Sequence, residues 1–487
     1  MTPVACDTLI GTAPIPTSTG TGTSPALGAT TFAPLVETAS YPRCEAVVIV
    51  PAKNEAAGIR ATLHALAKQR DLAGRPLDHA RYEVILLCNN CADLTAYHAR
   101  DFARVWPRFA LHVVEMTLPP GQANVGTARR LLMDEAYRRL RALGKLGGAI
   151  LSTDADSRVS PTWVAANLDA LAQGADAVGG RILTDPAGCD ALPPALRLRY
   201  LRDNVYQYLA AELEACVSPI AWDPWPRHHQ HFGASLALTA RTYERVGGVP
   251  RVKNLEDVAL VRALWRIDAR IRHTPAVRIV TSARRAGRAE QGLSELLSEW
   301  ERCGTALPVQ RVDSLPHLEA RFVRQGRLYA LWHGARRGYL PDGDTLAATA
   351  RAFAVEPGWL LPALRDGMAW GALHAATLAR REAEGRWVAP KPVPVTGAIL
   401  ALRARLSAWR AAELRRLAPD ATLPQVEAVR RRSLIDATLE TGTFPLLEQP
   451  MHGIAVQDAP LDLRRPVDEE QMPPRFQMRD HRLPRPR

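Results

Sequence analysis

Two aspartates, one residue apart, follow a short apolar run near the middle of the chain. The segment GGAILSTDADSR, residues 147–158, predicts a buried strand that ends just before Asp154 and Asp156. At a strand end both carboxylates can turn towards one point above the sheet edge. Two neighbouring hard oxygen ligands suit Mg²⁺ or Mn²⁺. A turn followed by a helix cap uses the same residue types, so the pair alone leaves a structural interpretation open.

A second acidic pair, Glu256 and Asp257, opens the helical pattern NLEDVALVRALWRID at residues 254–268. A carboxylate at such a position is a candidate general base. Acidic residues in a first turn also stabilise their own helix through the helix dipole. The pair by itself therefore supports a catalytic and a structural interpretation alike.

The elements that must position these carboxylates alternate along the chain. Apolar runs at 47–50, 82–87, 109–116, 149–152 and 175–182 predict strands, and helical patterns follow most of them. Strands that alternate with helices predict an α/β fold with a mostly parallel sheet covered on both faces. Polar loops at the carboxyl ends of such strands are where these sheets bind ligands.

Composition shifts predict the domain limits. Residues 1–42 are rich in Thr, Gly, Pro and Ser and predict a flexible lead-in, followed by the α/β domain at 43–290. Residues 291–454 form a helical C-terminal region, and 455–487, dense in Pro, Arg, Asp and Glu, predict a disordered tail.

The charge balance and the cysteines restrict the class of protein. The formal net charge is +12, almost wholly from arginine, yet no nucleic-acid-binding motif accompanies it. We expect no nucleic-acid partner, and leave peripheral contact with a membrane open. No apolar run approaches the ~18–20 residues of a membrane span. The seven scattered cysteines give no disulfide framework, so we expect a cytoplasmic protein.

Several motifs occur in a characteristic order: VVIVPAKNE, LLCNNCADLT, VGTARR, STDAD, HFGASLALTARTYERVGG and NLEDVALVRAL. In this order they resemble the inverting family 2 glycosyltransferases of the GT-A fold, over roughly residues 44–290. The resemblance implies a nucleotide-diphospho-sugar donor, a Mg²⁺ or Mn²⁺ ion and a hydroxyl acceptor that is a small molecule or lipid-linked. Because many relatives that build polymers carry membrane helices and this chain shows none, a small soluble acceptor is favoured.

The resemblance also implies roles for individual residues on the donor side. The residues expected to bind the nucleotide sugar are Pro51, Ala52, Asn54, Glu55, Asn90, Asp93, Arg129, Arg130, Asp154, Arg284 and Arg288. Asp156 is the expected chief metal ligand, with Asp154 assisting and His273 as an alternative third ligand. Arginine grips phosphate in two places where lysine acts as a point charge, which favours the arginines for the diphosphate.

On the acceptor side, the resemblance implies Asp257 as the catalytic base, with Glu256 beside it. Gly233, Ala234 and Ser235 match the acceptor-side strand and loop. Just before them, the loop at 218–231 is rich in Trp, Pro and His. Aromatic faces stack on sugars and imidazole edges bind hydroxyls, so Trp225 and His229 are candidates for acceptor contacts. Plain packing of the loop is the alternative.

Two other functions stay open at this point. A sugar-1-phosphate nucleotidyltransferase on a similar fold would need a Gly-rich loop with Arg or Lys straight after the first strand, and PAKNEAAG does not supply one. A non-catalytic scaffold that binds sugar nucleotides or lipids would not need all of Asp154, Asp156 and Asp257.

Overall fold

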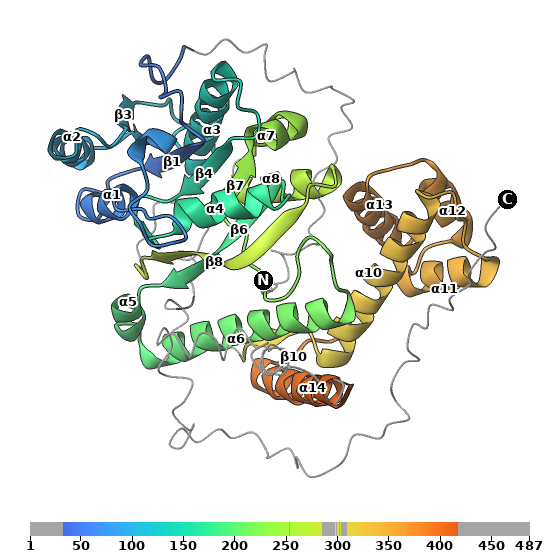
Figure 1. The fold of residues 1–487 in the computed structure, drawn as a ribbon. Helices are drawn as coiled ribbons and strands as arrows, with labels where there is room; N and C mark the ends of the chain where they lie inside the picture. The colour runs from blue at the N-terminus through green and yellow to red at the C-terminus, as the bar shows by residue number, and fades with distance from the viewer. Residues whose placement is uncertain are drawn as a thin grey trace. The chain divides into compact units, whose positions relative to one another are not determined.

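The computed structural model describes residues 33–252, 254–284 and 309–416, together with Ser298, Trp300 and Arg302. In this part of the chain the strands of the main sheet are β1 (Ala46–Ala52), β2 (Tyr82–Asn89), β3 (Leu111–Met116), β4 (Ala149–Thr153), β5 (Ser157–Val159), β6 (Ala177–Thr184), β7 (Ser235–Thr239) and β8 (Ile271–Thr281). Their order across the sheet is β3-β2-β1-β4-β7-β6-β8-β5 (Figure 1). The expected strands are present, and β4 lies near the middle.

The sheet is mostly parallel, as the sequence predicts. β1 pairs in parallel with β2 and with β4, and β6 pairs in parallel with β8. β7 runs antiparallel between β4 and β6, and the short β5 runs antiparallel to β8. The alternation of strands and helices did not indicate this reversal. As a result, the N-terminal end of β7 lies beside the carboxyl end of β4.

The helices around the sheet are α1 (Ile59–Ala67), η2 (His79–Arg81), α2 (Thr95–Val105), α3 (Val125–Ala142), α4 (Trp163–Ala172), α5 (Pro186–Asp190), α6 (Pro194–Val217), α7 (Ala240–Val246) and α8 (Glu256–Arg266). Side chains alternate along a strand, so β1 buries Val48 and Val50 on one face and Val47 and Ile49 on the other. The first face packs against α1, α2 and α4, and the second against α3, α7 and α8. Figure 1 shows α4 lying across the sheet.

The sequence explains where the two helices nearest the site begin. The side chain of Asn124 caps α3 by accepting the backbone N–H of Thr127 at 2.9 Å. α8 begins directly after Leu255, which adopts a left-handed backbone conformation with φ of 57°. This sharp entry places Glu256 and Asp257 in the first turn of α8.

The C-terminal region is helical, as predicted, over the residues that are described. Its elements are β9 (Arg311–Val312), α10 (Leu315–Ala335), α11 (Gly343–Phe353), α12 (Pro357–Arg365), α13 (Trp370–Ala383), β10 (Val393–Pro394) and α14 (Val395–Arg416). α10 and α14 pack against α6, and α13 packs against α8. Residues 417–454 and the predicted tail at 455–487 lie outside the described residues.

Part of the predicted lead-in is described, at residues 33–42. Val36 is buried, and the hydroxyl of Ser40 donates a hydrogen bond to Glu83 on β2 at 2.9 Å. These residues therefore contact the α/β domain. The domain limits at 42, 290 and 454 stay predictions.

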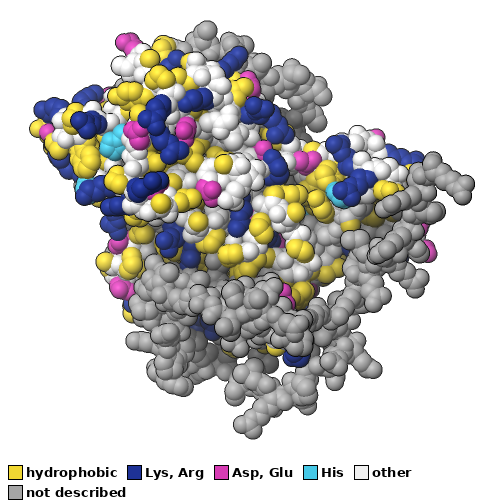
Figure 2. Space-filling view, viewed as in Figure 1, with side chains coloured by type: hydrophobic (Ala, Val, Ile, Leu, Met, Phe, Trp, Pro, Cys, Tyr) yellow, Lys and Arg dark blue, Asp and Glu magenta, His cyan; other side chains and the backbone are white. Residues whose placement is uncertain are grey.

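The excess of positive charge is spread over the surface. On the face shown in Figure 2, Lys and Arg side chains lie scattered among hydrophobic and neutral ones instead of gathering in one patch. Many of them are paired with carboxylates, as Arg81 is with Glu45 at 2.7 Å and Arg60 with Asp101 at 2.5 Å.

Candidate active site

The two aspartates of the D-x-D segment lie at the carboxyl end of β4. Between them Ala155 is buried in the core, and its carbonyl accepts the hydroxyl of Thr62 at 2.8 Å. Asp154, Ala155 and Asp156 form the turn between β4 and β5. Their side chains are 35% and 17% exposed, respectively. The structure thus places both carboxylates at one edge of the sheet, as the sequence predicts.

Arg129, near the start of α3, links this edge to α8. Its side chain is only 4% exposed, and it donates to Oδ1 of Asp154 at 2.7 Å and to Oε1 of Glu256. Its Nε also donates to the hydroxyl of Ser152 on β4 at 3.3 Å. A buried guanidinium held by two carboxylates fixes the distance between the elements that carry them. The first turn of α8 is therefore tied to the tip of β4.

Two glycines allow this close packing. A Cβ atom at Gly233 would lie 2.5 Å from Cζ of Arg129, which is not physically tolerable. A Cβ at Gly126 would lie 3.3 Å from Cβ of Glu256, tighter than an ordinary contact. Because residue 233 is glycine, the segment that leads into β7 can lie directly against the Arg129 ion pair.

Asp257 lies next to this cluster, with both carboxylate oxygens held by backbone. The N–H of Gly233 donates to Oδ2 at 2.7 Å, and the N–H of Val258 donates to Oδ1 at 2.8 Å. Burial raises the pKa of Asp154, Arg129 lowers it, and the charge of Asp257 raises it further. Asp257 is thus close enough to interact with the D-x-D segment, although the two lie far apart in the sequence.

Arg284, just after β8, joins the other side of the site. Its two terminal nitrogens donate to the two oxygens of Glu55 at 2.7 Å each, and one of them lies 3.1 Å from Oδ2 of Asp156. Burial and the neighbouring charge of Asp154 raise the pKa of Asp156 to about 6, although Arg284 opposes this. Arg284 therefore bridges the loop after β1 and the D-x-D segment.

These observations fit a divalent cation at Asp154 and Asp156. Burial and the charge of a neighbouring carboxylate raise the pKa of both carboxylates, and a guanidinium lies against each of them, Arg129 against Asp154 and Arg284 against Asp156. Among the described residues no group of three or more His, Cys, Asp or Glu side chains forms a complete metal cage. Mg²⁺ commonly binds through one or two carboxylates and completes its shell with waters and substrate phosphates.

The loops after β1 and β2 are held by the residues predicted to contact the nucleotide. Pro51 and Ala52 end β1, and Asn54 follows with a φ of 55°, which asparagine tolerates better than most residues. Asn54 accepts the N–H of Ala92 at 2.8 Å, and its own N–H donates to Sγ of Cys91 at 3.3 Å. The two loops are thereby locked together.

Asn90 and Asp93, in the loop after β2, also form hydrogen bonds with the backbone of neighbouring segments. The side-chain amide of Asn90 exchanges two hydrogen bonds of 3.0 Å with the backbone of Leu118. Asp93 is exposed and accepts the backbone N–H groups of Ala56 and Thr95, each at 3.0 Å. These contacts shape the loops, and the nucleotide roles of the side chains stay predictions.

Arg130 is not part of this cluster. Arg130 is half-buried on α3, and its charge acts on Asp134 and Tyr243. Arg288 lies outside the described residues.

The predicted acceptor residues divide into two groups. Gly233 lies in the site, and Ala234 beside it is half-buried. The hydroxyl of Ser235 is buried and accepts the indole N–H of Trp163 at 3.1 Å, which is a structural contact. The sequence could not show this, because Trp163 is distant in the chain.

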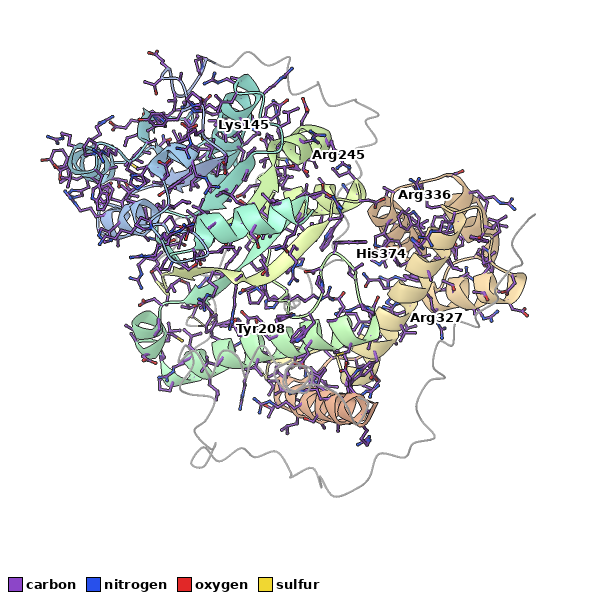
Figure 3. All side chains as sticks on the ribbon, viewed as in Figure 1. Lys145, Tyr208, Arg245, Arg327, Arg336 and His374 are labelled. Carbon is purple, nitrogen blue, oxygen red and sulfur yellow. The ribbon has the colours of Figure 1, made fainter. Side chains whose placement is uncertain are left out.

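Trp225 and His229 face α6. Trp225 lines a hollow with residues of α6 and α14, among them Cys216 and Trp409. The ring of His229 packs edge-on against Tyr208, which Figure 3 labels on α6. Burial, with the charges of His273 and Arg181, lowers the pKa of His229 to about 3. The geometry gives their predicted acceptor roles no support and favours the packing alternative.

The sequence did not predict the row of hydrogen-bonded side chains that joins Asp223, His273 on β8 and His231. Nδ1 of His273 lies 2.8 Å from Oδ2 of Asp223, and its Nε2 lies 3.2 Å from Nδ1 of His231. Burial would raise the pKa of Asp223, but His273 and Arg227 lower it overall. His273 is thus engaged in this row, and the alternative assignment as a metal ligand gains no contact that favours it. The only sign of this arrangement in the sequence is the group of His and Asp residues at 223–231.

Part of the chain is similar to known proteins. The family model described as glycosyl transferase family 2 matches residues 47–223. Solved structures with similar coordinates include a mannosyltransferase, PcManGT, from Pyrobaculum calidifontis, in complex with GDP-Man and Mn²⁺. It is 19% identical, with a TM-score of 0.31, over 84% of this chain and 90% of that one. TarS 1-349 from S. aureus, in complex with UDP-GlcNAc, is 14% identical, with a TM-score of 0.36, over 71% and 93%. No curated protein matches the chain.

One further observation concerns membranes. Among the described residues, none of the helices combines the length and the apolar character needed to cross a bilayer.

Proposed function

We propose that this chain, whose residues 47–223 match the model of glycosyl transferase family 2, is a glycosyltransferase of the GT-A fold. It transfers a sugar from a nucleotide-diphospho-sugar to a hydroxyl acceptor with inversion at the anomeric carbon. The observation that carries the proposal is the convergence of four segments that lie far apart in the sequence. Arg129 joins Asp154 to Glu256, and Gly233 joins the same cluster to Asp257. The predicted donor-side and acceptor-side carboxylates therefore share one site.

Asp257 is the proposed general base. In a single displacement, the bond from the anomeric carbon to the diphosphate oxygen breaks as the bond to the acceptor oxygen forms. The acceptor proton passes to the Asp257 carboxylate, and the nucleoside diphosphate leaves. The N–H groups of Gly233 and Val258 hold this carboxylate in one orientation, which a proton transfer requires.

Glu256 is the proposed positioning residue. It is 3% exposed and bound to Arg129, so it has no free path to an acceptor. Its charge holds Arg129, and Arg129 in turn keeps the first turn of α8 at the tip of β4. Asp257 depends on this arrangement for its place.

Asp156, with Asp154, is the proposed holder of a Mg²⁺ or Mn²⁺ ion. When bound, such an ion neutralises charge on the diphosphate. Arg284 lies against Asp156 and grips Glu55 with both terminal nitrogens. A guanidinium placed in this way is suited to exchange a carboxylate for a phosphate oxygen as the donor enters.

The test is a donor screen. The protein is incubated with Mn²⁺ and a panel of nucleotide sugars, and the release of nucleoside diphosphate is measured. We expect slow release from one donor by hydrolysis. A matched control is Asp169→Asn, an exposed position on α4 of the same domain, which should keep wild-type release.

The rival functions predict other results. A nucleotidyltransferase would form or consume pyrophosphate, and a scaffold would bind a sugar nucleotide without releasing nucleoside diphosphate. Either outcome across the whole panel would overturn the proposal.

A further inference from the structure

Two arginines of the C-terminal helices are buried without a close carboxylate. Arg324 on α10 is 8% exposed and Arg381 on α13 is 4% exposed. Among the described residues, the nearest carboxylate oxygen to Arg381 belongs to the exposed Glu382, 3.9 Å away, and Arg324 has no ion pair. The buried Nε of Arg381 has no hydrogen-bond partner. Buried guanidinium groups normally satisfy their donors, so the unpaired Nε of Arg381 is exceptional.

Both guanidinium groups meet at one aromatic ring. Cζ of Arg324 lies 4.9 Å from the ring centre of Trp387, and Cζ of Arg381 lies 4.5 Å from it. Trp387 itself is half-buried, so the ring reaches the surface beside the two buried charges. Cation–π contact offsets part of the cost of burying a guanidinium but supplies no hydrogen-bond acceptor.

The surrounding groups confirm that positive charge is concentrated here. Burial, followed by the charges of Arg381 and Arg321, lowers the pKa of Arg324 to about 10. Burial, with Arg324 and Arg381, lowers the pKa of His374 on α13 to about 4. Asp313, the acid whose charge acts on Arg324, is already paired with Arg321 at 3.0 Å. The guanidinium groups here outnumber the carboxylates that could neutralise them, so the site has room for the charge of a bound anion.

We propose that Arg324, Arg381 and Trp387 form a binding site for the phosphate group of a small soluble molecule. Two guanidinium forks match the charge and the several oxygens of a phosphate dianion, where a single carboxylate would satisfy fewer donors. The low exposure of both arginines restricts entry to a small group. This site shares no residue with the proposed donor site, so it goes beyond sugar transfer.

The test is a phosphate titration of the full chain. Inorganic phosphate is titrated by calorimetry, with sodium chloride at equal ionic strength as the reference, because a protein of net charge +12 attracts anions in general. We expect one saturable site. Arg324→Met and Arg381→Met should each weaken binding by about tenfold or more, since each removes one bidentate contact.

The matched control is Arg327→Gln. Arg327, which Figure 3 labels on α10, follows Arg324 by about one helical turn and is only half-buried. We expect the Arg327→Gln variant to bind phosphate with the affinity of the wild type. Arg381→Lys serves as a second variant that keeps the charge and loses the fork, and it too should bind at least about tenfold more weakly.

Thermal unfolding without phosphate separates a ligand site from a structural one. Both methionine variants should melt no lower than the wild type, because each removes a buried charge that lacks a partner. A lower melting temperature in both, with phosphate binding unchanged, would assign the arginines to structure alone and overturn the proposal. So would a wild type that responds to phosphate no more than to chloride.

Two further probes distinguish a soluble phosphate ester from a lipid headgroup as the source of the phosphate group. Glucose 6-phosphate represents a soluble phosphate ester, and vesicles with phosphatidic acid represent a lipid headgroup, with phosphatidylcholine vesicles as their control. We expect the soluble ester to bind in competition with inorganic phosphate. Binding to phosphatidic acid alone would contradict a site for a small soluble molecule.

Discussion

Replacing Asp257 by asparagine is expected to lower kcat for sugar transfer by about 10²–10⁴-fold, the range that general bases contribute. Asparagine keeps one acceptor oxygen, which the N–H of Gly233 can still use, so the loop keeps its place, while the N–H of Val258 loses its side-chain acceptor. The amide cannot take the acceptor proton. Affinity for the donor should stay at the wild-type level, because Asp257 acts on the acceptor side.

The measurement compares initial rates of transfer with the donor that the screen identifies. Asp169→Asn is the control for a generic aspartate-to-asparagine effect and should leave kcat unchanged. If Asp257→Asn transferred sugar at the wild-type rate, another group would be the base. A loss of donor affinity equal to the loss of rate would point to a structural role.

Replacing Arg129 by methionine is expected to lower the free energy of unfolding by about 3–5 kcal/mol, the cost of breaking a buried ion pair by removing one partner. Arg129 is 4% exposed and serves two carboxylates, Asp154 and Glu256. Without it, the charge of Glu256 would stay buried with no guanidinium beside it, and the partly exposed Asp154 would lose the same partner. Urea unfolding followed by circular dichroism measures the change.

Two further variants make this prediction specific. Arg130→Met, at the next and half-buried position, should change stability by only about 0.5 kcal/mol, as surface substitutions usually do. Adding Glu256→Gln to Arg129→Met should recover part of the loss, because a neutral amide is less costly to bury than a charge. Equal stability of Arg129→Met and the wild type would show that the ion pair does not hold α8 in place.

The positions of the two acidic pairs in the fold could be predicted from the sequence for a local reason. Asp154 and Asp156 follow an apolar strand directly, and Glu256 and Asp257 open a helix, so both positions can be read from neighbouring residues. The polar loops after β1 and β2 were equally visible, because each strand has a clear apolar run. The mostly parallel sheet followed from the alternation of strands and helices.

The contacts that assemble the site could not be read in this way. Arg129 and Glu256 are separated by 127 positions, and Arg284 and Glu55 by 229. A sequence motif can place an arginine on a helix, but it does not show which distant carboxylate that arginine will pair with. The reversal of β7 brings Gly233 against Arg129, and no local pattern indicates a strand's direction.

The aromatic loop shows a second limit. Trp225 and His229 have side chains that suit a sugar, yet both face α6, where His229 packs against Tyr208. Which side of a loop faces a helix depends on packing between distant elements. The composition of a loop does not determine it.

The most direct test of the account is the effect of Mn²⁺ on donor affinity. The donor is titrated into the wild type and into Asp156→Asn, each with saturating Mn²⁺ and with a chelator. We predict that Mn²⁺ strengthens donor binding to the wild type by about tenfold or more, as expected for an ion that links a carboxylate to a diphosphate. We predict that Asp156→Asn loses most of this gain. A donor that binds the wild type equally well with and without Mn²⁺, or a variant that keeps the full gain, would contradict the claim that this strand end holds the ion and the diphosphate.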